Sequence, residues 1–83
     1  MDLETLGREI SAHRKQRGLT QSELANRAGL SRATVTALET GSQRELGFNK
    51  LMAILATLKL DLRLTQANIG RPTLEDLQRD TSE

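Results

Sequence analysis

Residues 20–39 read TQSELANRAGLSRATVTALE and carry the signals of two short helices joined by a tight turn. Thr20 is a good N-cap, and Glu23 three residues later can complete a capping box, so a helix begins directly after Thr20. Gly29 can adopt the positive φ that ends this helix with a sharp reversal, and Ser31 can cap the next helix. The stretch therefore predicts a helix, a turn and a second helix.

Apolar residues mark the inner face of both expected helices. Leu24, Ala25 and Ala28 share one face of the first helix, and Val35 and Leu38 point inward from the second. The opposite face of the second helix has no large apolar side chain and is free to meet something outside the protein. This outer face holds Arg32, Ala33, Thr36 and Ala37.

A helix-turn-helix needs a small residue where its two axes approach, a left-handed residue at the corner and inward aliphatic residues beyond it. The residues that meet these needs are Ala25, Gly29, Val35 and Leu38. The stretch resembles the helix-turn-helix of the Xre family, the phage repressor and Cro type of DNA-binding domain, over roughly residues 6–60. The resemblance implies an all-α, compact repressor-like domain of four to five helices. A chance pair of amphipathic helices is the alternative.

Length and composition indicate one small domain with a thin aliphatic core. The chain has 83 residues, of which 36% are hydrophobic and 1% aromatic. Because a chain of this length is near the lower limit for independent folding, association into oligomers would supply missing apolar contacts. We expect residues 1–65 to form the DNA-binding and dimerisation domain and residues 66–83 to form a polar, partly disordered tail.

Charge is sorted along the chain, although the net charge is only +1. Residues 8–44 contain seven Lys or Arg and three Glu, a surplus of four positive charges. Residues 66–83 contain two Arg and four acidic residues, a surplus of two negative charges. The basic part coincides with the segment that is expected to contact DNA.

The absence of cysteine excludes a disulfide framework, a thiolate metal site and a cysteine nucleophile. No apolar run approaches the ~20 residues of a membrane span, and MDLETLGREI lacks the apolar segment of a signal peptide, so we expect a cytoplasmic protein. Without paired carboxylates, a phosphate-binding glycine loop or metal ligands, we expect neither an enzyme nor a bound cofactor. His13, the single histidine, is expected to be a surface or half-buried helix residue.

Apolar residues at helical spacing predict a first helix from residue 2 or 5 to residue 17, closed by Gly18. They are Leu3, Leu6 and Ile10. In the resembled family, an arginine at the position of Arg14 pairs with a glutamate at the end of the recognition helix, here Glu39. The resemblance therefore implies a partly buried ion pair that ties the first helix to the third.

The resemblance also implies which side chains contact the DNA backbone. Gln21 matches the glutamine that anchors a phosphate in the family, since its amide and the helix N-terminus both suit an anion. The loop after the recognition helix runs beside the backbone in that family, which makes Arg44 a phosphate partner; a solvated loop arginine is the alternative. The further candidates for phosphate contact are Arg17, Ser31 and Thr34.

Base reading is expected from the outer face of the recognition helix. Arg32 can donate two hydrogen bonds to guanine O6 and N7, a contact worth about 1 to 3 kcal/mol of discrimination. The methyl groups of Ala33, Thr36 and Ala37 can meet a thymine methyl but offer little hydrogen bonding. Much of the specificity is therefore expected from DNA shape and half-site spacing.

A fourth helix, from residue 47 to residue 58, and then a strand are predicted after this pair. The apolar positions of the helix wrap round more of its surface than one core-facing stripe requires, so another chain is expected to cover part of it. They are Phe48, Leu51, Met52, Ile54, Leu55 and Leu58. Leu60, Leu62 and Leu64 then alternate with polar residues, as in a half-buried strand. A lone strand needs a partner, and a second copy of the chain gives a short antiparallel ribbon.

The sequence GFNKLMAILATLKLDLRL, taken with the helix-turn-helix, resembles the HipB-like antitoxins, in which such a strand completes the dimer. Lys59 departs from the glycine that is expected at the end of the fourth helix. The resemblance implies a homodimer and a toxin partner of the HipA-like kinase type. The residues expected at the dimer interface are Phe48, Met52, Leu60, Leu62 and Leu64.

The polar tail offers few apolar anchors. Thr73 can cap a short helix through Leu74 and Leu77 after Pro72, but so few anchors favour disorder in the free protein. The two leucines amid acidic residues are alternatively suited to folding on a partner.

Together these features predict a sequence-specific DNA-binding transcriptional regulator that binds double-stranded DNA as a homodimer at an inverted-repeat operator. The protein is expected to repress its own operon, with activation left open, and to be the antitoxin of a toxin-antitoxin operon. The alternatives are a plain Xre-type repressor without a toxin partner and a protein-interaction module that has lost DNA binding.

Overall fold

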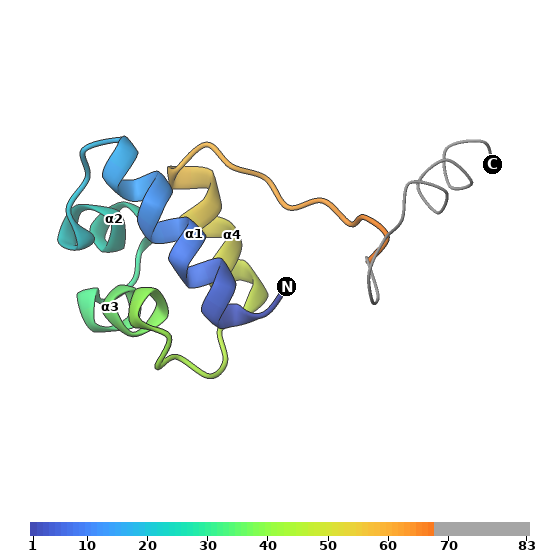
Figure 1. The fold of residues 1–83 in the computed structure, drawn as a ribbon. Coiled ribbons are helices and arrows are strands. Elements are labelled where there is room, and N and C mark those ends of the chain that lie inside the picture. Colours follow the sequence, from blue (N-terminus) through green and yellow to red (C-terminus); the bar gives the residue numbers. More distant parts are fainter. Residues whose placement is uncertain (68–83) are drawn as a thin grey trace.

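The computed structural model describes residues 1–67 and folds them into four α-helices (Figure 1). Their bounds are Leu3–Gln16 for α1, Gln21–Ala28 for α2, Arg32–Thr40 for α3 and Phe48–Thr57 for α4. The all-α class that the sequence predicts is confirmed, and the helix-turn-helix corresponds to α2 and α3.

The two ends of α2 follow from local side-chain chemistry. Thr20 Oγ1 accepts a hydrogen bond from the Glu23 backbone N–H at 3.0 Å, and the Glu23 carboxylate accepts one from the Thr20 N–H at 2.8 Å. Both halves of the predicted capping box are therefore present. Gly29 ends the helix with a φ of +74°, a left-handed conformation that glycine adopts without a Cβ clash.

The other helices begin at related signals. The Asp2 carboxylate accepts a hydrogen bond from the Thr5 N–H at 2.7 Å before α1, and the Ser31 hydroxyl accepts one from the Thr34 N–H at 3.1 Å before α3. α4 follows Gly47 and has no side-chain cap. The stability of α4 therefore depends more on the packing of its apolar face.

The core is one cluster of buried aliphatic side chains to which every helix contributes. Its members are Ile10, Leu24, Ala25, Val35, Leu38, Ile54, Leu55 and Leu58. α1 packs against α3, while α2 packs against both α3 and α4. Burying a leucine or isoleucine side chain contributes roughly 1.5 to 3 kcal/mol relative to leaving it exposed. The cluster thereby fixes the inner face of α3 and the direction in which its outer face points.

A close approach between α1 and α3 depends on the absence of a side chain. Gly7 is buried, and a Cβ at this position would collide with the carbonyl oxygen of Leu38. Glycine therefore allows the backbone of α1 to lie against the last turn of α3. The sequence pattern does not predict this contact, because Gly7 lies in mid-helix with no turn signal around it.

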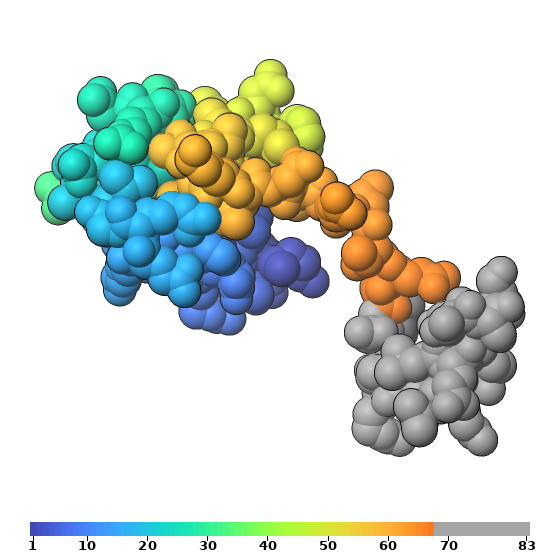
Figure 2. All heavy atoms as spheres, turned by 90° about the horizontal axis from the view of Figure 1, so that it is seen from above, coloured from blue at the N-terminus to red at the C-terminus, as the bar shows by residue number. Residues whose placement is uncertain are grey.

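α4 ends in a left-handed turn at Lys59, whose φ is +59°. The sequence lacks a glycine at this position, yet the backbone takes the conformation that glycine favours. The Leu60 N–H donates a hydrogen bond to the Leu55 carbonyl at 2.7 Å and closes the helix end. Residues 61–67 then lead away from the helical body (Figure 2).

The strand predicted at residues 60–65 is not formed within the single chain. No strand occurs among residues 1–67, and the side chains of Leu62 and Leu64 are 42% and 97% exposed. A strand requires a neighbouring strand for its backbone hydrogen bonds, and one copy of this segment offers none. Pairing across a homodimer therefore stays a prediction.

Two expectations concern residues outside the described part of the chain. The short helix expected at Thr73, Leu74 and Leu77 lies outside it, as does most of the tail from residue 66. Within residues 1–67, no helix has the length and apolarity to cross a membrane. Over the same range, no three His, Cys, Asp or Glu side chains gather in a way that suits a metal ion.

Candidate nucleic-acid interface

The outer face of α3 lines a shallow, open depression of about 490 Å³. The residues that line it are Arg32, Ala33, Thr36, Ala37, Thr40 and Ser42. Arg32 and Ala33 are exposed, whereas Thr36 and Ala37 are half-buried. The structure therefore brings the four residues predicted to read bases together on one accessible surface.

Thr40 and Ser42 join this surface, although the sequence pattern does not single them out. The Thr40 hydroxyl donates a hydrogen bond to the Thr36 carbonyl at 2.9 Å and lies 3.2 Å from the Ser42 hydroxyl. Thr40 follows Thr36 by one helical turn, and this spacing is a signal that could have identified it. The position of Ser42 depends on the turn at Gly41, whose φ is +85°, and has no comparable signal.

An ion pair between Arg14 and Glu39 ties α1 to the end of α3. Arg14 Nε donates to Glu39 Oε2 at 2.7 Å, and a terminal nitrogen of Arg14 donates to Glu39 Oε1 at 3.0 Å. The two side chains are only 10% and 4% exposed. The Arg14 guanidinium also donates to the Leu19 carbonyl at 2.6 Å, which places the loop before α2. These are the two residues that the family resemblance pairs.

The environment of this pair keeps both side chains charged. Burial, the largest effect on Glu39, acts to raise the pKa of its carboxyl, but hydrogen bonds from Arg14 and Gln21 outweigh it and hold that pKa below its ordinary value. The hydrogen bonds to Glu39 raise the pKa of Arg14. Glu39 is therefore an ionised carboxylate at neutral pH, with no hydrogen to donate.

The side chain of Gln21 connects this ion pair to the outer face of α3. Gln21 Nε2 donates to Glu39 Oε1 at 3.0 Å, and the Thr36 hydroxyl donates to Gln21 Oε1 at 2.8 Å. One amide hydrogen of Gln21 remains for another acceptor. A residue expected to anchor phosphate and a residue expected to read bases are thus in direct contact, which the sequence pattern does not predict.

The other residues expected at phosphates form one contacting pair and two separate arginines. Ser31 and Thr34 share a hydroxyl hydrogen bond of 2.9 Å at the N-terminus of α3. Arg17 follows the end of α1, and its guanidinium donates to the His13 carbonyl at 3.2 Å. Arg44 lies beyond the C-terminus of α3, so the structure does not gather all four side chains at one place.

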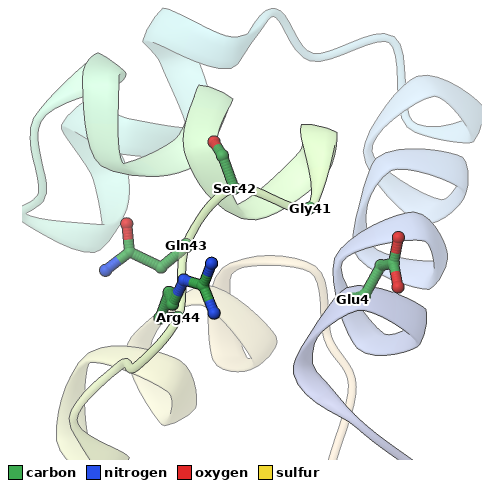
Figure 3. Close-up of a pocket in the computed structure, with 5 residues that line it drawn as sticks. All are labelled: Glu4, Gly41, Ser42, Gln43 and Arg44. Atoms are coloured by element: carbon green, nitrogen blue, oxygen red, sulfur yellow. The ribbon is translucent and has the colours of Figure 1, made fainter.

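Arg44 belongs to a second open depression, of about 400 Å³, below the end of α3 (Figure 3). Gly41, Ser42 and Gln43 line it from the loop, and Glu4 of α1 stands on its other side. Arg44 is exposed, and within residues 1–67 no ion pair to it is formed. Its guanidinium is available to a partner.

The residues expected at a dimer interface differ in exposure. Phe48 on α4 is 63% exposed, and Leu62 and Leu64 on the following segment are 42% and 97% exposed. Met52 and Leu60 are half-buried and pack against the core. Apolar surface therefore remains open at α4 and beyond it in a single copy of the chain.

Comparisons with known proteins agree with this geometry. A family model described as helix-turn-helix matches residues 10–64. An uncharacterized HTH-type transcriptional regulator of Methanothermobacter thermautotrophicus is 56% identical over 68 residues, which cover 82% of this chain and 81% of the relative.

Solved structures of regulators are similar as well. The clp gene regulator ClgR of Corynebacterium glutamicum has a TM-score of 0.65 and 28% identity, covering 69% of this chain and 60% of its own. SinR, described as the master regulator for biofilm formation and solved with DNA, has a TM-score of 0.63 and 29% identity. The match covers 66% of this chain and 87% of the SinR chain. A chain in a complex of the SinR and SinI proteins has a TM-score of 0.62 and 30% identity. The match covers 65% of this chain and 52% of the chain in the complex. This chain thus spans about half of the matched chain in that complex.

Proposed function

The chain belongs to the helix-turn-helix family, and from this premise we propose that it is a transcriptional regulator that binds double-stranded DNA sequence-specifically. The observation that carries the proposal is the open outer face of α3, which presents Arg32 among small side chains. The major groove of DNA is about 12 Å wide and admits one α-helix. Because Val35 and Leu38 are fully buried, the face that enters the groove has a fixed orientation.

Arg32 is the proposed principal reader of bases. It stands at the first position of α3 and is exposed, so its guanidinium can reach guanine O6 and N7 in the groove. Ala33 and Ala37 add methyl groups that fit against thymine, and Thr36 adds a methyl and a hydroxyl. With one strong donor group per copy, DNA shape and half-site spacing contribute the rest of the specificity.

Phosphates on both sides of the groove are the proposed partners of the flanking polar residues. Ser31 and Thr34 lie at the N-terminus of α3, where free backbone N–H groups favour an anion. Gln21 has a remaining amide hydrogen beside the N-terminus of α2, and Arg44 is exposed beyond the other end of α3. Arg17 completes this proposed phosphate-binding set at the end of α1.

We propose that the protein binds DNA as a homodimer. Support comes from the exposed Phe48 and Leu64 and from residues 61–67, which leave the helical body with their backbone unpaired by a strand. Two copies of residues 60–65 would form an antiparallel ribbon whose leucines cover α4. Such a dimer presents two copies of α3 to an inverted repeat, with half-sites about one helical turn, roughly 34 Å, apart.

The finer proposal is that the protein is an autorepressor and the antitoxin of a toxin-antitoxin operon, with a HipA-like kinase as the toxin. Apolar surface that remains open on α4 and residues 61–67 favours a protein partner in addition to DNA. The similar SinR protein has been solved both with SinI and with DNA, so a regulator of this kind can have a protein partner in addition to DNA. Co-purification with the product of the neighbouring gene separates this proposal from a plain repressor.

A footprint on the DNA upstream of the protein's own gene tests the proposed function. We expect an inverted repeat to be protected and the affinity to fall steeply with salt, since phosphate contacts release counterions. Equal binding to operator and scrambled duplexes would remove the sequence-specific part of the proposal. Absence of salt-dependent binding to any DNA would favour an interaction module instead.

A further inference from the structure

The hydroxyl of Thr36 lies at the end of a chain of hydrogen bonds that begins at the buried ion pair. Arg14 donates to Glu39, Gln21 donates to Glu39, and Thr36 donates to Gln21. Each bond lies between 2.7 and 3.0 Å in length. The chain of bonds runs from α1 to the end of α3, from there to α2, and back to the middle of α3.

Chemistry fixes the direction of every bond in this chain. An ionised carboxylate only accepts hydrogen bonds, so Gln21 must turn its NH₂ group, and not its oxygen, toward Glu39. The amide oxygen of Gln21 then faces Thr36, and an oxygen in that position only accepts. The Thr36 hydroxyl has one hydrogen, and it must point inward to Gln21. This assignment follows from the charge of Glu39 and not from the choice between two amide orientations.

We infer that Thr36 meets DNA as a hydrogen-bond acceptor only. Thr36 lines the open depression, and its hydroxyl oxygen keeps lone pairs that can accept, but it has no hydrogen left for a base. In the major groove the donors that fit such an acceptor are the exocyclic amino groups, N6 of adenine and N4 of cytosine. The acceptors that it cannot bind as a donor are purine N7, guanine O6 and thymine O4.

The inference assigns Gln21 a positioning role in addition to its proposed phosphate contact. If the Thr36 hydroxyl turned outward to donate to a base, its oxygen would face the Gln21 amide oxygen at 2.8 Å with no hydrogen between them. Gln21 Oε1 would then lose the hydrogen that it accepts and would face a second oxygen, which is unfavourable. The inference rests on the proposed function, because it specifies how the same surface selects bases.

Base analogues test the inference directly. The preferred duplex of the full chain is first selected from a randomised DNA library. The same selection with Thr36→Val identifies the base pair at which the variant has a weaker preference than the wild type. At that pair, replacing adenine by purine, or cytosine by 2-pyrimidinone, removes the amino group. We expect this change to weaken binding by the wild type about 2- to 10-fold, the range for one hydrogen bond. Removing N7 from the purine of the pair with a 7-deaza base should leave the affinity unchanged.

Variants of this chain supply the controls. In Gln21→Met the hydroxyl is free to donate, so sensitivity to the 7-deaza base should appear, whatever the overall affinity. Thr57→Val makes the same chemical change on α4, where the hydroxyl donates to the Ala53 carbonyl, and should leave both analogue effects unaltered. A wild type that responds to the 7-deaza base and not to loss of the amino group, or to neither, overturns the inference. So does a selected duplex in which Thr36→Val changes no position.

A measurement on the free protein separates failure of the inference from failure of the proposed function. By NMR in water, the Thr36 hydroxyl hydrogen should exchange slowly in the wild type and rapidly in Gln21→Met. Equally rapid exchange in both proteins overturns the hydrogen-bond chain even if DNA is bound. If the library yields no preferred duplex, the proposed function fails, while slow exchange would still support the inward hydroxyl.

Discussion

Arg14 and Glu39 lie far apart in the sequence, and their side chains meet in a two-point ion pair, with Nε to Oε2 at 2.7 Å, that joins α1 to the end of α3. The side chains of the pair are almost fully buried, and Glu39 also accepts a hydrogen bond from the side chain of Gln21. Three helices are therefore tied to one carboxylate, and the position of α3 depends on it.

Removal of the arginine should destabilise the fold strongly. In Arg14→Met, Glu39 loses both bonds and remains as a buried charge, so we expect the free energy of unfolding to fall by about 3 to 5 kcal/mol. Urea denaturation followed by circular dichroism measures this change. Arg8→Met is the matched control, because Arg8 makes only exposed contacts, an ion pair of 3.8 Å with Glu4 and a hydrogen bond of 3.4 Å to Thr5 Oγ1, and the change should alter stability little. Equal stability of the two variants would refute a structural role for the pair.

Acid should weaken the protein through Glu39. Its pKa is lower in the folded protein than its ordinary value of 4.5, so the stabilisation is fully present above about pH 4.5 and is lost as the pH falls through the lowered pKa. Denaturation curves from pH 7 down to pH 3 should show this decline. In Glu39→Gln the free energy of unfolding should fall less steeply with decreasing pH. Part of the decline should remain, because Asp2 and Glu23 also have lowered pKa values and also lose stabilisation in acid. If the free energy of unfolding of Glu39→Gln depended on pH as steeply as that of the wild type, Glu39 would not be a source of the acid sensitivity.

A side chain at Gly7 should force α1 and α3 apart. Gly7→Ala places a Cβ against the Leu38 carbonyl, and the overpacking is expected to lower the free energy of unfolding by about 1 to 3 kcal/mol or more. Gly47→Ala is a matched control, since no atom lies within 4 Å of its added Cβ and its φ is −62°. We expect a smaller effect from the control in thermal or urea denaturation. A stable Gly7→Ala variant would show that the helices can separate at no cost.

Substitutions at Arg32 and Gln21 should affect DNA binding in different ways. Arg32→Ala removes a proposed bidentate contact to guanine and should reduce the preference for operator over scrambled duplex by about 1 to 3 kcal/mol. Gln21→Ala removes a proposed phosphate contact and should lower the affinity for both duplexes, with a smaller change in their ratio. Fluorescence anisotropy with both duplexes at one salt concentration measures the two affinities. The same change of ratio in both variants would dispute the division between base and phosphate contacts.

A charge at Leu62 should separate the proposed dimer. In the two-stranded ribbon Leu62 faces α4 and the partner copy, so Leu62→Asp would bury an unpaired carboxylate, and we expect monomers in analytical ultracentrifugation. Thr65→Asp places the same charge on the opposite face of the segment and should remain dimeric. Survival of the dimer in Leu62→Asp would exclude this interface.

Local signals in the sequence are sufficient to predict the helix-turn-helix. Thr20 with Glu23, Gly29 and Ser31 each act on their own few residues, and each does in the structure what its chemistry predicts. Periodicity likewise predicts the buried positions Val35 and Leu38, because the two-sided pattern of a helix is set by its own turn. Fold class and helix order follow from such short-range effects.

Features that depend on distant residues are not predictable in the same way. The contact of Gly7 with Leu38 requires the relative placement of two helices, and the bond from Thr36 to Gln21 requires the turn between α2 and α3 to bring those side chains together. The predicted strand depends on a second chain. In the surface of α3, the sequence predicts four of the lining residues and omits Thr40 and Ser42, which enter it through the end of the helix and the loop.

If Arg32 and Ala33 read bases as proposed, their exposure separates the choice of DNA target from folding. Neither side chain is buried, so amino-acid substitutions at the first turn of α3 are expected to leave the fold intact. Thr36, in the middle of the helix, is instead hydrogen-bonded to Gln21. During evolution, new promoters would be acquired mainly through that first turn, and the middle of the helix would change only in concert with α2. Paralogues that control different genes are then expected to share one scaffold and to diverge first at these two exposed positions.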